Sequence, residues 1–111
     1  MKFLRSLLLL LSLAMVHTAH GQPGVAFEAA NAAYEAGEYN DALTRYESLL
    51  ETHRHFESEF NAGNAAFKLG AWGRARLHYE RAKLLDPSNE HLQANLALLE
   101  SKIVDLSLIH I

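Results

Sequence analysis

Two histidines in one short segment are the first residues whose types and spacing suggest chemistry. His53 and His55 flank Arg54, and two imidazoles at this spacing can share a metal ion. The pattern fixes no carboxylate beside them that would complete a coordination sphere, and the segment is a predicted turn. We therefore interpret them as solvent-exposed turn histidines and expect no metal site.

Other candidate catalytic groups lack a supporting pattern. His78 and His91 lie on predicted helix surfaces. The serines at 48, 58, 88 and 101 have no nucleophile signature around them, and no glycine-rich loop has phosphate-binding spacing. The absence of cysteine excludes disulfides, thiolate metal sites and a cysteine nucleophile. We expect a protein that is not an enzyme and needs no cofactor.

Length and charge narrow the class of protein further. The chain has 111 residues, of which 50% are apolar, and this allows one small domain. Ten basic residues against 13 acidic residues give a formal charge of -3. This charge offers no general attraction to phosphate backbones, so we expect no nucleic-acid partner.

The N-terminal residues have the pattern of a secretory signal. Lys2 and Arg5 precede an apolar stretch from Leu7 to Val16, which is short for a membrane span. Ala19 and Gly21 are the small residues expected before a cleavage site. We predict a signal peptide over 1–21 and an exported, periplasmic protein. The alternative is an uncleaved signal, which would hold the protein at the membrane.

The last six residues, 106–111, break the helical pattern that precedes them. They are similar to the in-frame translation of a transposon-end adapter used in DNA library preparation. We predict a non-native tail and a natural protein that continues past Asp105. A genuine short tail is the alternative.

An internal repeat is the most informative feature of the chain. A shift of 33 residues aligns the two halves at many positions, among them Phe27 with Phe60, Asn31 with Asn64, Tyr34 with Phe67, Gly37 with Gly70 and Tyr46 with Tyr79. A period in the low thirties is typical of a solenoid built from helix pairs. The repeat therefore predicts an all-α fold.

Hydrophobic spacing places five helices along this repeat. The first ends at Gly37, and the second begins where Asn40 supplies a cap and Asp41 a first-turn acid. The third covers about 56–69, the fourth 74–85, and the fifth carries an apolar stripe made of Leu92, Leu96, Leu99 and Ile103. Small residues are expected where helix backbones approach closely, at Ala30, Ala33, Ala42, Gly63, Ala66 and Ala75.

The second unit resembles the tetratricopeptide-repeat signature position by position, at Gly63, Leu69, Gly70, Trp72, Ala75, Tyr79, Ala82 and Pro87. The first unit departs from it with Ala30 in place of glycine and Arg54 in place of proline. The resemblance implies a right-handed α-solenoid of two helix pairs, units 22–55 and 56–89. A capping or incomplete third-repeat helix over 90–105 completes the prediction.

A narrower resemblance involves the run 60–82 with Asp86 and Pro87, which is similar to the Bat aerotolerance family. That family implies a signal peptide, repeats, a transmembrane helix and a small C-terminal domain. Its members work in the envelope beside von Willebrand factor A-type Bat partners and a cytoplasmic AAA+ ATPase. We therefore expect a scaffold or adaptor that reaches the membrane through a missing C-terminal segment. The alternatives are the repeat region of a larger exported enzyme and another envelope assembly protein.

The repeat resemblance also implies where a protein or peptide partner binds, on the first helix of each pair. The predicted groove residues are Phe27, Asn31, Tyr34, Phe60, Asn61, Asn64, Phe67 and Lys68. Asparagine suits such a groove because its amide can donate to and accept from an extended main chain. The chaperone-type carboxylate clamp does not fit, since Phe27, His91 and Asn95 stand at its basic positions. The alternative is that these residues mainly pack the helices together.

Charge is distributed unevenly between the two units. Residues 23–59 carry eight acids and two bases, whereas residues 60–87 carry two acids and five bases. Arg74 and Arg81 share one face of the fourth helix and form a predicted basic face. This face could steer a protein partner or order self-association, and ordinary solvated helix surface is the alternative.

Overall fold

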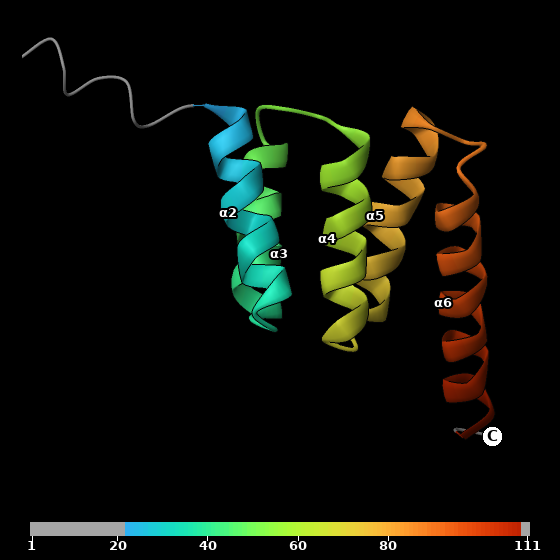
Figure 1. The fold of residues 1–111 in the computed structure, drawn as a ribbon. Helices are drawn as coiled ribbons and strands as arrows, with labels where there is room; N and C mark the ends of the chain where they lie inside the picture. Colours follow the sequence, from blue (N-terminus) through green and yellow to red (C-terminus); the bar gives the residue numbers. More distant parts are fainter. Residues whose placement is uncertain (1–21, 110–111) are drawn as a thin grey trace, which may run out of the picture.

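The computed structural model describes residues 22–109, and the predicted signal peptide over 1–21 lies outside them. The described residues form five helices and no strand. These are α2 (Pro23–Glu35), α3 (Tyr39–Leu50), α4 (Phe56–Lys68), α5 (Trp72–Leu85) and α6 (Glu90–Ile109) (Figure 1). The all-α prediction is confirmed.

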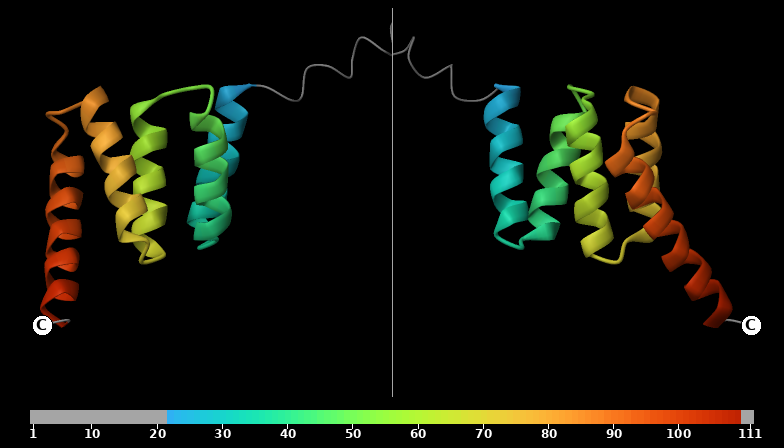
Figure 2. Two further views of the ribbon diagram at one scale, coloured as in Figure 1. Left: turned by 180° about the vertical axis from the view of Figure 1, so that it is seen from behind. Right: turned by 45° about the vertical axis from the view of Figure 1, so that its right-hand side comes forward.

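Consecutive helices pack side by side in two layers. The closest packing joins α2 to α3 and α4 to α5, and α3 against α4 connects the two pairs. Figure 1 shows α2 and α4 in one layer with α3 and α5 behind them, and the view from the back in Figure 2 (left) brings α3 and α5 to the front. Helix α6 packs against α5 at the C-terminal end of the stack. This arrangement presents α2, α4 and α6 on one side and α3 and α5 on the other.

Glycine ends the first helix of each pair, as the sequence predicts. Gly37 and Gly70 have φ angles of 77° and 72°, a conformation that side chains with a Cβ rarely adopt. At both positions the amide that follows the glycine donates back into the helix, from Glu38 to Ala33 and from Ala71 to Ala66, each over 2.9 Å. This is the hydrogen-bond pattern of a Schellman C-cap, repeated at the 33-residue period.

Two helix starts differ from the prediction. Helix α3 begins at Tyr39 after Glu38, so Asn40 lies inside its first turn and supplies no cap. The Asn40 carbonyl instead accepts a hydrogen bond from Thr44 Oγ1. Helix α5 begins at Trp72, two residues before the expected start. Neither start has a side-chain cap, and the carbonyls of Glu38 and Ala71 accept the first helical hydrogen bonds, from the amides of Ala42 and Ala75.

Small residues make up most of the core, together with two tyrosines and four leucines. Tyr46 and Tyr79 are 1% exposed and sit among fully buried alanines. Helix α6 is docked through Leu92 and Leu99, which are completely buried. The predicted small residues Ala30, Ala33, Ala42, Gly63, Ala66 and Ala75 are all buried, which lets the helix backbones approach one another.

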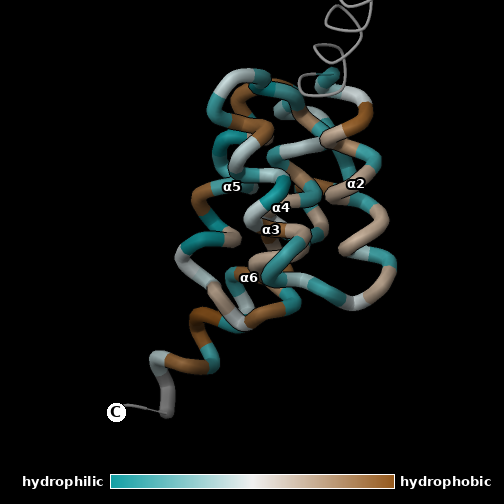
Figure 3. Tube along the Cα trace, turned by 90° about the vertical axis from the view of Figure 1, so that its left-hand side faces the viewer, coloured by the Kyte–Doolittle hydropathy of each residue, from teal (hydrophilic) through white to brown (hydrophobic). Residues whose placement is uncertain are grey.

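Polar and apolar residues are mixed along the helices, as the hydropathy colours of Figure 3 show. Within residues 22–109, no helix combines the length and the apolar character needed to cross a membrane. Helix α6 continues through 106–109, the first part of the predicted non-native tail.

Candidate functional site

A hydrogen-bonded triad of one tyrosine and two asparagines joins the first three helices. The Tyr46 hydroxyl on α3 donates to Oδ1 of Asn31 on α2 over 2.5 Å. Asn61 on α4 donates through Nδ2 to the same oxygen over 3.2 Å. One side-chain carbonyl of α2 therefore anchors both its own partner helix and the next pair.

The same triad recurs one repeat later. The Tyr79 hydroxyl on α5 donates to Oδ1 of Asn64 on α4 over 2.6 Å, and Asn95 on α6 donates to that oxygen over 2.9 Å. Burial raises the pKa of both Tyr46 and Tyr79 to about 12. The hydroxyls therefore stay protonated and able to donate at neutral pH.

Each triad leaves part of its amide groups unused. Oδ1 of Asn31 and of Asn64 is occupied, but their Nδ2 groups form no hydrogen bond among the described residues. The reverse holds for Asn61 and Asn95, whose Nδ2 groups are used and whose Oδ1 atoms are not. All four side chains are half-buried. Each triad thus retains one free donor group and one free acceptor.

The predicted groove rings repeat with the same period. Phe27 packs on Tyr46 with ring centroids 6.2 Å apart, and Phe60 packs on Tyr79 at 6.0 Å. The edge-to-face contacts repeat as well, Tyr34 with Tyr39 at 5.3 Å and Phe67 with Trp72 at 5.1 Å. The four predicted rings are partly buried against the core. They support helix packing and keep part of their surface exposed.

Lys68, the remaining predicted groove residue, forms no hydrogen bond with either triad. It is exposed in the last turn of α4 and forms no hydrogen bond or ion pair within residues 22–109. The structure therefore joins the predicted asparagines and rings on the α2–α4–α6 side.

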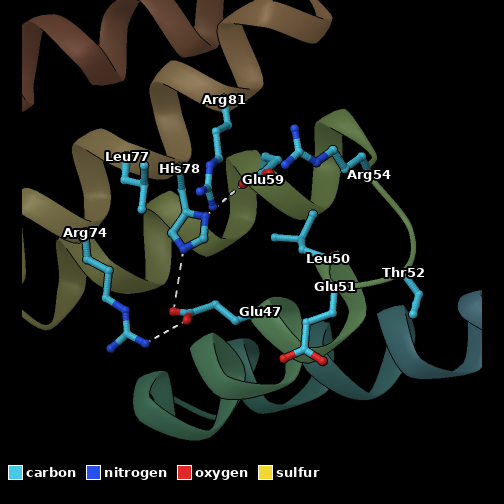
Figure 4. A pocket seen from close by; sticks show the side chains of 10 residues that line it. All are labelled: Glu47, Leu50, Glu51, Thr52, Arg54, Glu59, Arg74, Leu77, His78 and Arg81. Carbon is cyan, nitrogen blue, oxygen red and sulfur yellow. Dashed lines mark hydrogen bonds and ion pairs between the residues drawn. The ribbon is translucent and has the colours of Figure 1, made fainter.

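A charged pocket of about 410 Å³ lies on the other side, between α3 and α5 (Figure 4). His78 lies within it, and its prediction as a helix-surface residue is wrong because its side chain is 4% exposed. His78 Nδ1 lies 2.8 Å from Oε2 of Glu59 on α4, which is also buried. His78 Nε2 lies 3.5 Å from Oε1 of Glu47 on α3, an atom with no hydrogen-bond partner.

Sequence reasoning missed this cluster, although a signal was available. Glu59 stands three and seven residues before Ala62 and Ala66, on the buried stripe of α4. His78 lies between Ala75 and Ala82 on the buried stripe of α5. Titratable residues on two apolar stripes indicate a buried pair, because a buried charge needs a partner.

The two arginines of the predicted basic face differ in whether they form an ion pair. Arg74 donates to Glu47 over 2.6 Å, so part of the positive charge of the second pair is paired with the first pair. Arg76 pairs in the same way with Glu100 on α6. Arg81 lines the charged pocket and has no ion-pair partner among the described residues.

The turn histidines are exposed, as the sequence predicts. His53 Nδ1 lies 2.8 Å from Thr52 Oγ1, and His55 Nε2 lies 3.0 Å from Oε2 of Glu57. Nowhere in the part of the chain that the structure describes do three His, Asp or Glu residues gather as a metal site would require.

Comparison with known protein-family models found no match, and comparison with curated proteins found none either.

Proposed function

We propose that this chain is a protein-binding module of the tetratricopeptide-repeat type, with no catalytic role of its own. In this proposal α2 to α5 form two repeats of a right-handed α-solenoid, and α6 caps them. The observation that carries the proposal is the pair of Tyr–Asn–Asn triads. Each leaves a free amide donor and a free carbonyl acceptor on the α2–α4–α6 side.

A free donor beside a free acceptor matches the needs of an extended main chain, whose N–H and C=O groups are unpaired. The tyrosine bonds hold the asparagine side chains in place before the ligand arrives, which lowers the entropy lost on binding. Partly exposed rings at Phe27, Tyr34, Phe60 and Phe67 would add apolar contacts. The rings would supply binding affinity, and the amides would fix the direction in which the peptide main chain runs.

We also propose that the module is exported and serves as a scaffold or adaptor in an envelope complex of the Bat type. The signal-like pattern over 1–21 and the resemblance of 60–82 to that family support this part. Its partner would be another envelope protein.

The binding proposal is tested with displayed peptides. An extended strand needs about six residues to cross three helices spaced about 8–10 Å apart, so a library of unstructured peptides about ten residues long covers the face. Asn61→Ala with Asn95→Ala removes both free acceptors and leaves the two tyrosine–asparagine bonds intact. We expect selected peptides to bind the double variant about tenfold more weakly by fluorescence anisotropy.

Asn40→Ala is the matched control, because Asn40 is an exposed asparagine on α3 whose side chain makes no hydrogen bond among the described residues. It should bind like the parent. Equal affinity of parent and double variant, at equal helical content by circular dichroism, would contradict the groove.

For the envelope proposal, the parent should copurify with a von Willebrand factor A-type protein from membranes and the double variant should not.

A further inference from the structure

A second pocket, of about 650 Å³, lies next to the first Tyr–Asn–Asn triad and is called the side-chain pocket below. Pro23 and Phe27 on α2 and Leu49 on α3 give it apolar walls, and the α3–α4 loop and Ser58 on α4 complete it. None of its lining residues is acidic, whereas three glutamates line the charged pocket between α3 and α5. Arg54 lines both pockets, and Figure 4 shows its guanidinium group in the charged one.

The side-chain pocket lies one helical turn from the first triad on all three helices of that triad. Phe27 is four residues before Asn31, and Ser58 is three residues before Asn61. On α3, which runs antiparallel to α2 and α4 (Figure 1), Leu49 is three residues after the tyrosine of the triad. Residues three or four apart share a helix face and are separated by about 5 Å along the axis. A leucine or phenylalanine side chain can span such a distance from a main chain held at the triad.

The polar groups in the wall of this pocket mostly contact one another. Thr52 Oγ1 lies 2.8 Å from His53 Nδ1, and Ser58 Oγ lies 3.4 Å from His55 Nδ1. The His55 ring also meets Phe27 edge to face, with ring centroids 5.7 Å apart. Apolar surface with few free polar groups suits an apolar side chain better than a charged one, because a buried charge needs a partner.

Larger residues fill the equivalent space in the second repeat. Phe56 stands at the repeat position of Pro23 and stacks on Phe60 with ring centroids 5.7 Å apart. Leu92 stands at the position of Ser58, three residues before the α6 asparagine of the second triad, and is completely buried. A large ligand side chain is therefore accommodated beside the first triad rather than beside the second.

We propose that the side-chain pocket binds one large apolar side chain, of leucine or phenylalanine size, from the extended segment that the triads hold. This role rests on the proposed peptide-binding function and adds the side chain that the partner must carry. The partner has a large apolar residue at the first triad and a small residue at the second. That difference sets the register of the segment, because one register alone brings the large side chain to the pocket.

The test uses the full chain and N-acetyl-leucinamide, which combines the amide groups of a main chain with a leucine side chain. N-acetyl-alaninamide has the same amide groups and is the counterpart. We expect the leucine compound to cause saturable NMR shifts at the amides of Phe27, Thr52 and Ser58, with a Kd on the order of 1–10 mM. The alanine compound should not saturate below about 50 mM. Equal Kd values for the two compounds, or saturation by neither, would overturn the proposal.

Two variants fill the pocket from different helices. Gly24 lines the pocket and an added Cβ there meets nothing within 4 Å, so Gly24→Leu has room, and Ser58→Leu copies the buried leucine of the second repeat. Gly73→Leu is the matched control, since Gly73 is also the second residue of its helix, has the same free space and lies outside the pocket. Each filling variant should weaken binding of the leucine compound at least about tenfold, and the control should not. Gly24→Leu keeps the proposal testable if Ser58→Leu unfolds, and parent-like binding by Gly24→Leu would overturn it.

Asn61→Ala separates the pocket from the groove, because it removes the free carbonyl of the first triad and leaves the pocket lining intact. Binding of the leucine compound should weaken about threefold. Unchanged binding would refute the main-chain contact at the triad, while selectivity for leucine over alanine would still support the pocket. Lost selectivity with retained dependence on Asn61 would refute the pocket and support the groove. If dilution of the protein alone shifts the same amides, a second copy fills the pocket and the proposal is overturned.

Discussion

Gly63 on α4 packs directly against the Tyr79 ring on α5, and we predict that Gly63→Ala destabilises the protein. A Cβ at this position would overlap Cδ1 and Cε1 of Tyr79 and would lie 3.2 Å from Cγ. Normal carbon contacts are about 3.5–4.0 Å, so the ring or a helix must move. Tyr79 cannot give way easily, because it is 1% exposed and its hydroxyl is held by Asn64.

Two opposing terms set the size of the effect. Overpacking of a filled core costs about 1–3 kcal/mol, and the upper end applies because the overlap involves two atoms of a fixed ring. Alanine is about 1 kcal/mol better than glycine inside a helix, which offsets part of this cost. We expect a net loss of about 2 kcal/mol in the free energy of unfolding, a large share of the stability of so small a domain.

Gly73→Ala is the matched control, since Gly73 also lies in a helix but an added Cβ meets nothing within 4 Å. It should stabilise the protein by about 0.5–1 kcal/mol. Urea unfolding followed by circular dichroism at 222 nm measures both variants. A drop in the midpoint of about 1–2 M is expected for Gly63→Ala. If that variant is as stable as the parent, the Tyr79 ring does not pack against Gly63 as the structure places it.

Two further predictions concern the buried tyrosines. Asn64→Ala should lower the free energy of unfolding by about 1–3 kcal/mol, because it leaves the Tyr79 hydroxyl buried without an acceptor. Adding Tyr79→Phe should recover part of this loss in urea melts. No recovery would mean that Asn64 does not hold that hydroxyl. The raised pKa of about 12 for Tyr46 and Tyr79 predicts a stability that is complete below pH 10 and declines as the pH rises from 10 through 12, because the unfolded chain ionises first. Absorbance at 295 nm should show these two tyrosines ionising late, and titration of every tyrosine near pH 10 in the folded protein would contradict the burial.

The helices and their ends could be predicted because they depend on local properties. Apolar spacing at the helical period identified five helices, and Gly37 and Gly70 stop two of them because only glycine readily takes the positive φ needed there. The 33-residue period also paired residues that make the same contacts in the structure, such as Tyr46 with Tyr79 and Asn31 with Asn64. Because the sequence repeats, the local packing repeats as well, and contacts within one unit predict the equivalent contacts within the other.

Contacts between the pairs were decided by the tertiary structure alone. The burial of His78 could have been inferred from the apolar stripe of its own helix, but no property of that helix shows that Glu47 and Glu59, 31 and 19 positions earlier, lie against it. The asparagine partners across units are likewise 30 and 31 residues apart. Which faces meet depends on how one pair rotates and crosses over the next, and that geometry is set by side-chain packing over the whole interface rather than by hydrophobic spacing within a helix. For this reason the sequence alone determined the helices and their repeat, whereas the buried charges and the free amide groups followed only from the docking of one pair on the other.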